Sequence, residues 1–152
     1  MIKILFVCTG NTCRSPMAEL IFKKLLKQAQ VKNVKVSSAG LHVVAEGIEA
    51  NAKEALKAMG IRVSSKKARP LTEKMIRSSN IVICMTEAHK QALSAFPNVF
   101  TFSELTDCGE ICDPYGGDLA VYTACAKQLK GACENLLTEL ILRGRQLQGN
   151  PS

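Results

Sequence analysis

The sequence predicts one α/β domain built on a four-stranded parallel sheet with helices on both faces. Apolar, β-branched segments alternate along the chain with amphipathic helical patterns, which is the arrangement of an α/β protein. The first segment, residues 2–7, is almost continuously apolar, as expected of a strand buried on both faces of a parallel sheet. Because the 152 residues contain no linker or internal repeat, we predict a single domain over residues 1–152.

The first helix is predicted to follow a short loop after this strand. Met17, Leu20 and Ile21 begin an apolar face, while lysines occupy the outside. Ser15 is a residue type that commonly caps a helix, and Pro16 suits the first helical position, where its missing N–H costs nothing. The first 30 residues therefore predict a strand, a tight loop and a helix.

The later elements are predicted from the same alternation. In order, they are a strand over 34–38, a helix over 48–59, a short helix capped by Thr72, a strand over 81–85, a helix from Thr86 to Pro97, a strand over 99–102 and a long helix over 122–140. Asp118, at the end of a turn-rich stretch, is expected to cap the long helix. Residues 144–152 have little to bury, so we expect a frayed tail there.

Composition and charge narrow the possible functions. The chain is 47% hydrophobic and 22% charged, as in soluble globular proteins, and no apolar run reaches the roughly 18 residues of a membrane span. The N-terminus lacks the pattern of a signal peptide, so we expect a soluble, cytoplasmic protein with no membrane partner. The net charge of +7 attracts anions, but the basic residues are scattered and few aromatics accompany them, so no nucleic-acid partner is predicted.

The seven cysteines do not form a metal-binding pattern. No Cys-x-x-Cys pair occurs, and Cys108 and Cys112 stand four residues apart without a second ligand pair. Cys84, Cys125 and Cys133 fall in apolar patterns and are expected in the core, where a free cysteine behaves as a small hydrophobe. We therefore predict no metal and no cofactor.

The loop after the first strand has the chemistry of a phosphate site that carries a nucleophile. Successive backbone N–H groups and the start of a helix bind anions, and the Arg14 guanidinium can hold two oxyanion oxygens. Cys8 begins the loop, and this electropositive setting favours its thiolate, which Ser15 could hold by a hydrogen bond. The predicted phosphate-binding loop comprises Thr9, Gly10, Asn11, Thr12, Cys13, Arg14 and Ser15.

A phosphoryl transfer from substrate to Cys8 also needs a proton donor for the leaving group. Asp113 is the candidate, because Pro114 stiffens the chain after it and Gly116 and Gly117 permit the loop to move. Arg14, Cys8 and Asp113 are the predicted catalytic residues.

These motifs resemble the low-molecular-weight protein-tyrosine-phosphatase family. The resemblance rests on Cys8-(five residues)-Arg14-Ser15 after the first strand and on Asp113-Pro114-Tyr115 late in the chain, with Ser37–Gly40 and Ile83–Met85 between them. It extends from Ile4 to about Leu142. It implies a phosphocysteine on Cys8, phosphoryl binding by Arg14, and Asp113 acting first as acid and then as base. It also implies that Asn11 and Ser38 hold the loop in shape through hydrogen bonds.

Thr12 connects the loop with one branch of that family. Tyrosine-specific members commonly carry Ile or Leu at this position, whereas the loop sequence here resembles the bacterial protein-arginine-phosphatase branch. We therefore expect phosphoarginine to be favoured, with phosphotyrosine as the alternative. Thr12 and Tyr115 are the predicted specificity residues, and Tyr115 is expected to form a wall of the pocket.

Other expectations concern residues around the loop. The family often has histidine near Lys66, where it supports the loop asparagine, and the resemblance also allows Cys8 and Cys13 to form a protective disulfide. His42 and His89 are expected to be structural or solvated, because neither lies beside a motif in the sequence.

Three other functions are alternatives to the phosphatase. An arsenate reductase would need a cysteine close after Cys84, and a phosphocarrier subunit of a sugar transport system would need neither Arg14 nor Asp113. A non-catalytic redox switch would use Cys8 and Cys13 alone. The expected partners are phosphorylated proteins, and the expected assembly is a monomer or weak homodimer.

Overall fold

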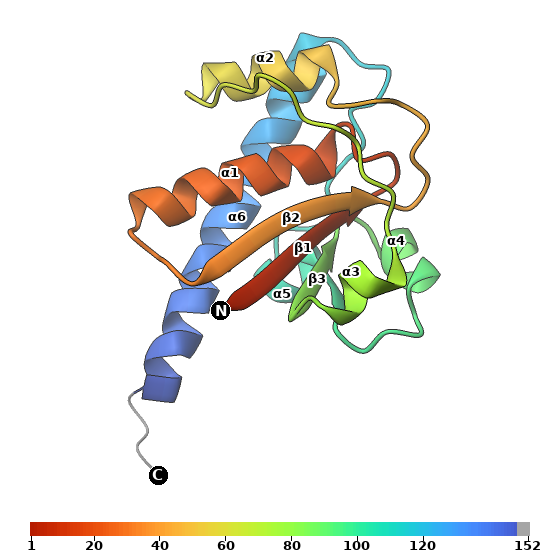
Figure 1. Ribbon diagram of the computed structural model, residues 1–152. Helices are drawn as coiled ribbons and strands as arrows, with labels where there is room; N and C mark the ends of the chain where they lie inside the picture. The colour runs from red at the N-terminus through yellow and green to blue at the C-terminus, as the bar shows by residue number, and fades with distance from the viewer. Residues whose placement is uncertain (149–152) are drawn as a thin grey trace.

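The computed structural model describes residues 1–148 and shows helices alternating with strands (Figure 1). The elements are β1 Ile2–Cys8, α1 Arg14–Gln28, β2 Val34–Gly40, α2 Ala50–Ala58, α3 Glu73–Arg77, β3 Ile81–Cys84, α4 Glu87–Ala92, β4 Val99–Thr101, α5 Phe102–Thr106 and α6 Leu119–Gln148. Among these helices, none is both long and apolar enough to cross a membrane.

The four strands form one parallel sheet in the order β2-β1-β3-β4, which confirms the predicted fold class. The central strand β1 pairs with β2 from Ile2 opposite Val34 to Cys8 opposite Gly40. The chain runs outward from β1 to β2 and then returns to place β3 on the other side of β1. In such sheets a crevice opens at the carboxyl ends where the order reverses, and Cys8 lies at this point.

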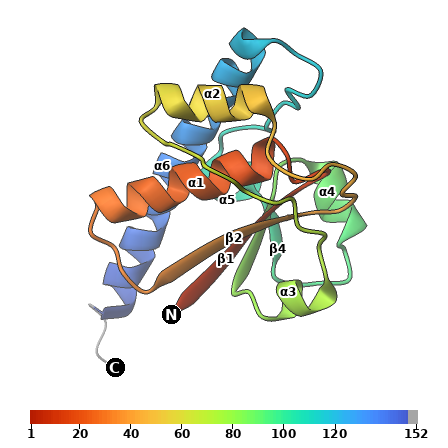
Figure 2. The same cartoon turned by 45° about the horizontal axis from the view of Figure 1, so that its top comes forward.

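Helices cover both faces of the sheet, as predicted. Figures 1 and 2 show α1, α2 and α6 on one side and α3 and α4 on the other. Along β1, Ile4 and Phe6 belong to the core under the first group, whereas Leu5 and Val7 belong to the core under the second. This alternation follows from the two-residue period of a strand, which sends successive side chains to opposite faces.

The predicted cap of the first helix is wrong. The helix begins at Arg14 with Cys13 at the N-cap position, and no side chain among the described residues caps it. The Ser15 hydroxyl lies instead 2.9 Å from Cys8 Sγ and accepts a hydrogen bond from Asn11. Pro16 is consequently the third helical residue, still within the first turn, where a backbone N–H has no partner within the helix.

The predicted elements of the second half form with shifted ends. The helix after Thr86 ends at Ala92 rather than at Pro97, and Phe102 begins α5 instead of ending the strand. Sequence reasoning missed α5, although Thr101 and Glu104 form its capping box. Asp118 Oδ1 accepts a hydrogen bond from the N–H of Val121 at 3.1 Å, as expected of a cap on α6.

The last helix is longer than predicted. It continues to Gln148, past the position at which a frayed tail was expected to begin, and residues 149–152 lie outside the described part of the chain.

Candidate active site

Cys8 is held at the end of β1 by the first turn of α1. Its side chain is buried, with Sγ 2.9 Å from Ser15 Oγ and 3.4 Å from the backbone nitrogen of Ser15. The Ser15 hydroxyl accepts a hydrogen bond from Asn11 Nδ2 at 2.8 Å, and its own proton can be donated to the sulfur at 2.9 Å or to the Ala39 carbonyl at 3.4 Å. Two donors at the start of a helix therefore face Cys8 Sγ, an arrangement that stabilises a thiolate.

The end of β2 and the segment after it fix the backbone of the loop. The N–H of Leu41 donates to the carbonyl of Cys8 at 3.0 Å, and the N–H of His42 donates to that of Thr9 at 2.8 Å. Gly40 makes the close approach possible, since a Cβ there would lie 2.8–2.9 Å from the backbone of residues 9–11. Asn11 adopts a left-handed φ of 55°, a conformation that asparagine tolerates better than most residues.

A chain of buried polar side chains supports the loop from behind. Asn11 Nδ2 donates to Ser38 Oγ at 3.0 Å, Asn11 Oδ1 accepts from the N–H of Arg69 at 2.8 Å, and Ser38 Oγ donates to Glu19 Oε1 at 2.7 Å. Lys66 Nζ donates to the same Glu19 oxygen at 2.8 Å. Lys66, which stands where the family often has histidine, therefore reaches the loop asparagine through Glu19 and Ser38.

Glu19 is the residue of this network that sequence reasoning missed. It occurs on a helix rich in lysine and resembles a solvated surface residue, yet it is 3% exposed. Burial alone would raise its pKa, but hydrogen bonds from Lys23, Lys66 and Ser38 lower the pKa below its ordinary value. Glu19 is thus a buried carboxylate with several donors.

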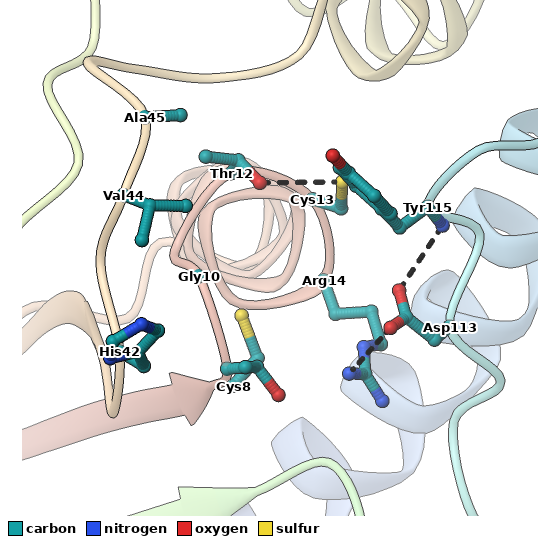
Figure 3. A pocket seen from close by; sticks show the side chains of 11 residues that line it. Cys8, Gly10, Thr12, Cys13, Arg14, His42, Val44, Ala45, Asp113 and Tyr115 are labelled. Carbon is teal, nitrogen blue, oxygen red and sulfur yellow. Dashed lines mark hydrogen bonds and ion pairs between the residues drawn. The ribbon is translucent and has the colours of Figure 1, made fainter.

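Arg14 and Asp113 lie side by side at the edge of the loop, although 98 residues lie between them in the sequence (Figure 3). Arg14 Nη2 lies 3.4 Å from Asp113 Oδ2, and Nη1 donates to the carbonyl of Ile111 at 3.1 Å. Asp113 Oδ1 accepts from the N–H of Tyr115 at 3.1 Å. The guanidinium is buried, whereas Asp113 is 54% exposed in its side chain, so the carboxylate is accessible to a substrate.

The loop forms the floor of a cavity of about 290 Å³. His42, Val44 and Ala45 lie along one side, opposite Asp113 and Tyr115 (Figure 3). The loop residues in the lining are Cys8, Thr9, Gly10, Thr12, Cys13 and Arg14. Tyr115 lines this cavity as predicted, but at 74% exposure it also belongs to the surface, as does Val44 at 82%.

Comparison with known proteins identifies the family. A family model described as low molecular weight phosphotyrosine protein phosphatase matches residues 3–146. The chain belongs to this family. The protein-arginine-phosphatase of Bacillus subtilis is 39% identical over 145 residues, which cover 90% of this chain and 93% of that protein. PtpB of Staphylococcus aureus, a low molecular weight protein-tyrosine-phosphatase, is 34% identical over 132 residues, which cover 84% of this chain and 91% of PtpB.

A solved structure agrees with these relatives. The YwlE arginine phosphatase, in a mutant with a phosphorylated active-site serine in place of cysteine, has a TM-score of 0.87 at 35% identity. The match covers 91% of this chain and 95% of that one. The fold and family predicted from the motifs are therefore confirmed, and the chain is a cysteine-dependent phosphatase.

The second cysteine of the phosphatase loop lies against the last helix. Cys13 Sγ is 3.3 Å from the hydroxyl of Tyr122, a fully buried residue of α6, and 3.6 Å from Thr12 Oγ1. Burial raises the pKa of Cys13, although the hydrogen bonds from Tyr122 and Thr12 oppose this effect. Cys13 is consequently a protonated thiol at neutral pH, and its disulfide with Cys8 stays a prediction.

Both histidines lie closer to the phosphatase loop than their sequence positions indicated. His89 is buried, with Nε2 2.9 Å from Thr9 Oγ1, and His42 lines the cavity. Burial, together with the charge of Arg14, lowers the pKa of His89 to about 4, so the ring is neutral at physiological pH. The α/β topology brings α4 beside the loop, a proximity that spacing in the sequence does not reveal.

The three cysteines predicted in the core are buried, as expected. Burial raises the pKa of Cys84 to about 12 and has the same effect on Cys125. Cys84 and Cys125 are therefore protonated at neutral pH, and neither lines the cavity.

Proposed function

We propose that this phosphatase hydrolyses phosphorylated protein residues through a phosphocysteine on Cys8. The observation that carries the proposal is the placement of Cys8 Sγ within 2.9 Å of Ser15 Oγ, on the floor of a cavity that Arg14 and Asp113 also line. A thiolate held in this way is a nucleophile, and the N–H groups of the loop and of the first turn of α1 suit the oxygens of a phosphoryl group.

In the first step, the Cys8 thiolate attacks phosphorus. An S–P bond forms while the bond from phosphorus to the leaving nitrogen or oxygen breaks. Arg14 holds the non-bridging oxygens and offsets their charge, as arginine does in phosphoryl transfer. The protonated Asp113 carboxyl gives its proton to the leaving atom. The 3.4 Å between Arg14 Nη2 and Asp113 Oδ2 supports these roles, because both groups border the same space.

In the second step, water attacks the phosphorus of the phosphocysteine. The Asp113 carboxylate, left ionised by the first step, accepts a proton from the water. The S–P bond breaks, inorganic phosphate leaves, and the Cys8 thiolate is restored. The proton taken from water returns Asp113 to the protonated state in which it entered the first step.

Phosphoarginine is the substrate that we propose to be favoured. The Bacillus subtilis relative named protein-arginine-phosphatase is more similar to this chain than PtpB is, at 39% against 34% identity. Within the cavity, Thr12 supplies a hydroxyl and Asp113 a carboxylate, and both can accept hydrogen bonds from a guanidinium. The apolar side chains of Val44 and Ala45 suit the aliphatic part of an arginine.

Phosphotyrosine is the second candidate. The exposed ring of Tyr115 lies at the mouth of the cavity and could stack on a phenyl ring. A polar contact in a pocket discriminates between substrates more strongly than an apolar wall does, so the hydroxyl of Thr12 favours the guanidinium.

The test is release of phosphate from phosphoarginine and phosphotyrosine peptides side by side under reducing conditions. Cys8→Ser should abolish turnover, while Cys108→Ser, a partly exposed cysteine outside the cavity, should leave it unchanged. A larger kcat/KM for phosphoarginine supports the proposal in full. A larger value for phosphotyrosine keeps the mechanism and overturns the substrate. Absence of turnover on both overturns the proposal and favours the phosphocarrier.

A further inference from the structure

The segment that carries the proposed general acid is attached to the last helix through the side-chain amide of Gln128 and, more weakly, through the thiol of Cys125. We call residues 110–113 the acid segment. Gln128 of α6 donates from Nε2 to the carbonyl of Glu110 at 2.8 Å, and its Oε1 accepts from the N–H of Cys112 at 3.4 Å. One side chain thus bonds the backbone on both sides of Ile111, which lies two residues before Asp113.

Two further contacts hold the middle of the acid segment. Ile111 is fully buried, and its N–H donates to the carbonyl of Met85 at 3.1 Å. Its carbonyl accepts from Arg14 Nη1 at 3.1 Å. Ile111 therefore links the acid segment to the end of the sheet and to the phosphate-binding arginine.

The part of the acid segment nearest the acid has much less support. Cys112 and Asp113 are exposed, so packing does not hold them. Within the described residues, the Asp113 carboxylate has polar contacts with Arg14 and with the N–H of Tyr115, an exposed neighbour two positions on. The Cys112 N–H donates to Gln128 Oε1, and the Cys112 carbonyl accepts a weaker bond from Cys125 Sγ at 3.7 Å. Of these two contacts with α6, the amide of Gln128 is the one that also holds Glu110, so it limits rotation of the chain on both sides of Ile111.

We propose that Gln128 is a positioning residue that keeps Asp113 over the leaving group. The inference rests on the proposed function, because it assumes that Asp113 protonates the leaving atom. An amide suits the task because it donates to one backbone group and accepts from the other. A glutamate would lack the donor for Glu110, and a leucine of similar size would lack both groups.

The experiment compares Gln128→Leu with the unaltered enzyme on two aryl phosphates. Phenyl phosphate has a poor leaving group that needs a proton, whereas 2,4-dinitrophenyl phosphate has a good one that leaves without it. The measured quantity is kcat/KM, which reports the steps through departure of the leaving group. We expect Gln128→Leu to lower it about 10-fold for phenyl phosphate and less than about 2-fold for the dinitrophenyl ester, because general acids contribute about 10²–10⁴-fold. Gln28→Leu, an exposed glutamine of α1 outside the cavity, is the matched control and should change neither value.

A double-mutant cycle with Asp113→Asn separates positioning from general damage. If Gln128 acts through Asp113, Gln128→Leu should cost nothing further on phenyl phosphate once Asp113→Asn has removed the acid. Equal losses on both esters, or losses that multiply in the double variant, would overturn the inference. If Gln128→Leu does not fold in a thermal melt, Gln128→Met, which also lacks both amide groups, replaces it and is expected to show the same ester dependence. An unaltered enzyme that hydrolyses neither ester and releases no phosphate from phosphoarginine peptides would contradict the proposed function instead.

Discussion

Replacing Lys66 with methionine is expected to destabilise the phosphatase and to slow it, because Lys66 neutralises a buried carboxylate behind the phosphate loop. Lys66 Nζ lies 2.8 Å from Glu19 Oε1, and the two side chains are 18% and 4% exposed. Methionine retains most of the aliphatic stem, so the change removes the charge and its hydrogen bond while leaving the packing largely intact.

The size of the destabilisation depends on the hydrogen-bond donors that Glu19 keeps when Lys66 is replaced. Stripping a buried ion of its partner costs about 3–5 kcal/mol, but Glu19 would retain the donors Lys23 and Ser38. The loss is therefore closer to one charge-assisted hydrogen bond, about 1.5–3 kcal/mol in the free energy of unfolding. At about 2–4 °C per kcal/mol for a chain of this size, Tm should fall by about 3–12 °C.

Urea unfolding of Lys66→Met beside Lys67→Met measures this loss. Lys67 is exposed and adjacent in sequence, so its variant controls for the removal of a surface charge. Glu19→Gln provides the complementary background, because a neutral amide needs no cation. The double variant Glu19→Gln, Lys66→Met should lose about 1 kcal/mol less than the two single variants together, since the residues interact directly.

Lys66→Met should also change the pH dependence of the free energy of unfolding. The pKa of Glu19 in the folded protein lies below its ordinary 4.5, so its contribution to stability is present above that value and is lost as the pH falls through the lowered pKa. Without Lys66 the pKa is lowered less, and stability should decline less steeply on acidification below about pH 4.5. The reasoning is refuted if Lys66→Met and Lys67→Met unfold at the same urea concentration at pH 7.

Three further predictions test individual contacts. Gly40→Ala should lower the free energy of unfolding, measured in urea, by about 1–3 kcal/mol, because the new Cβ would lie 2.8–2.9 Å from the loop backbone. The same change should weaken binding of inorganic phosphate, and an unchanged phosphate affinity would contradict the role of this close approach. Tyr122→Phe in a Cys8→Ser background should slow the alkylation of Cys13 by iodoacetamide, because the Tyr122 hydrogen bond lowers the pKa of Cys13. Mass spectrometry measures the rate of alkylation, and an equal or faster rate would contradict this prediction. Thr12→Ile should raise kcat/KM for phosphotyrosine over phosphoarginine peptides by about 10-fold, and an unchanged ratio would remove Thr12 from the specificity residues.

The sheet and the loop were predictable from sequence because their signals are local. The apolar run before Cys8 and the helical pattern after it specify a strand, a loop and a helix without reference to the rest of the chain. Cys8, Arg14 and Ser15 could be recognised because phosphate chemistry needs these residue types within a few positions. The cap at Ser15 was predicted wrongly for the same reason, since a local preference for serine at a cap was outweighed by its contacts with Cys8 and Asn11.

The supports of the site were not predictable because they depend on contacts between distant elements. Glu19 has the sequence surroundings of a surface residue. It is buried because Ser38 of β2 and Lys66, both distant in sequence, lie against its carboxylate. Gln128 occurs within a helical pattern that shows which residues face the core, but not that the acid segment would lie along its side.

The network around Glu19 and the amide of Gln128 support different groups of the proposed reaction, the nucleophile and the general acid. Lys66, Glu19 and Ser38 act on Asn11, and through it on Ser15 and the proposed nucleophile, whereas the hydrogen bonds of Gln128 go to the acid segment. Arg14, the residue proposed to bind the phosphoryl group, follows the loop and bonds to the acid segment through the Ile111 carbonyl and Asp113. A change at Lys66 should therefore alter the reactivity of the Cys8 thiolate toward any electrophile, with both aryl phosphates slowed alike. A change at Gln128 should leave that reactivity intact and slow only those substrates whose leaving group needs the proton from Asp113.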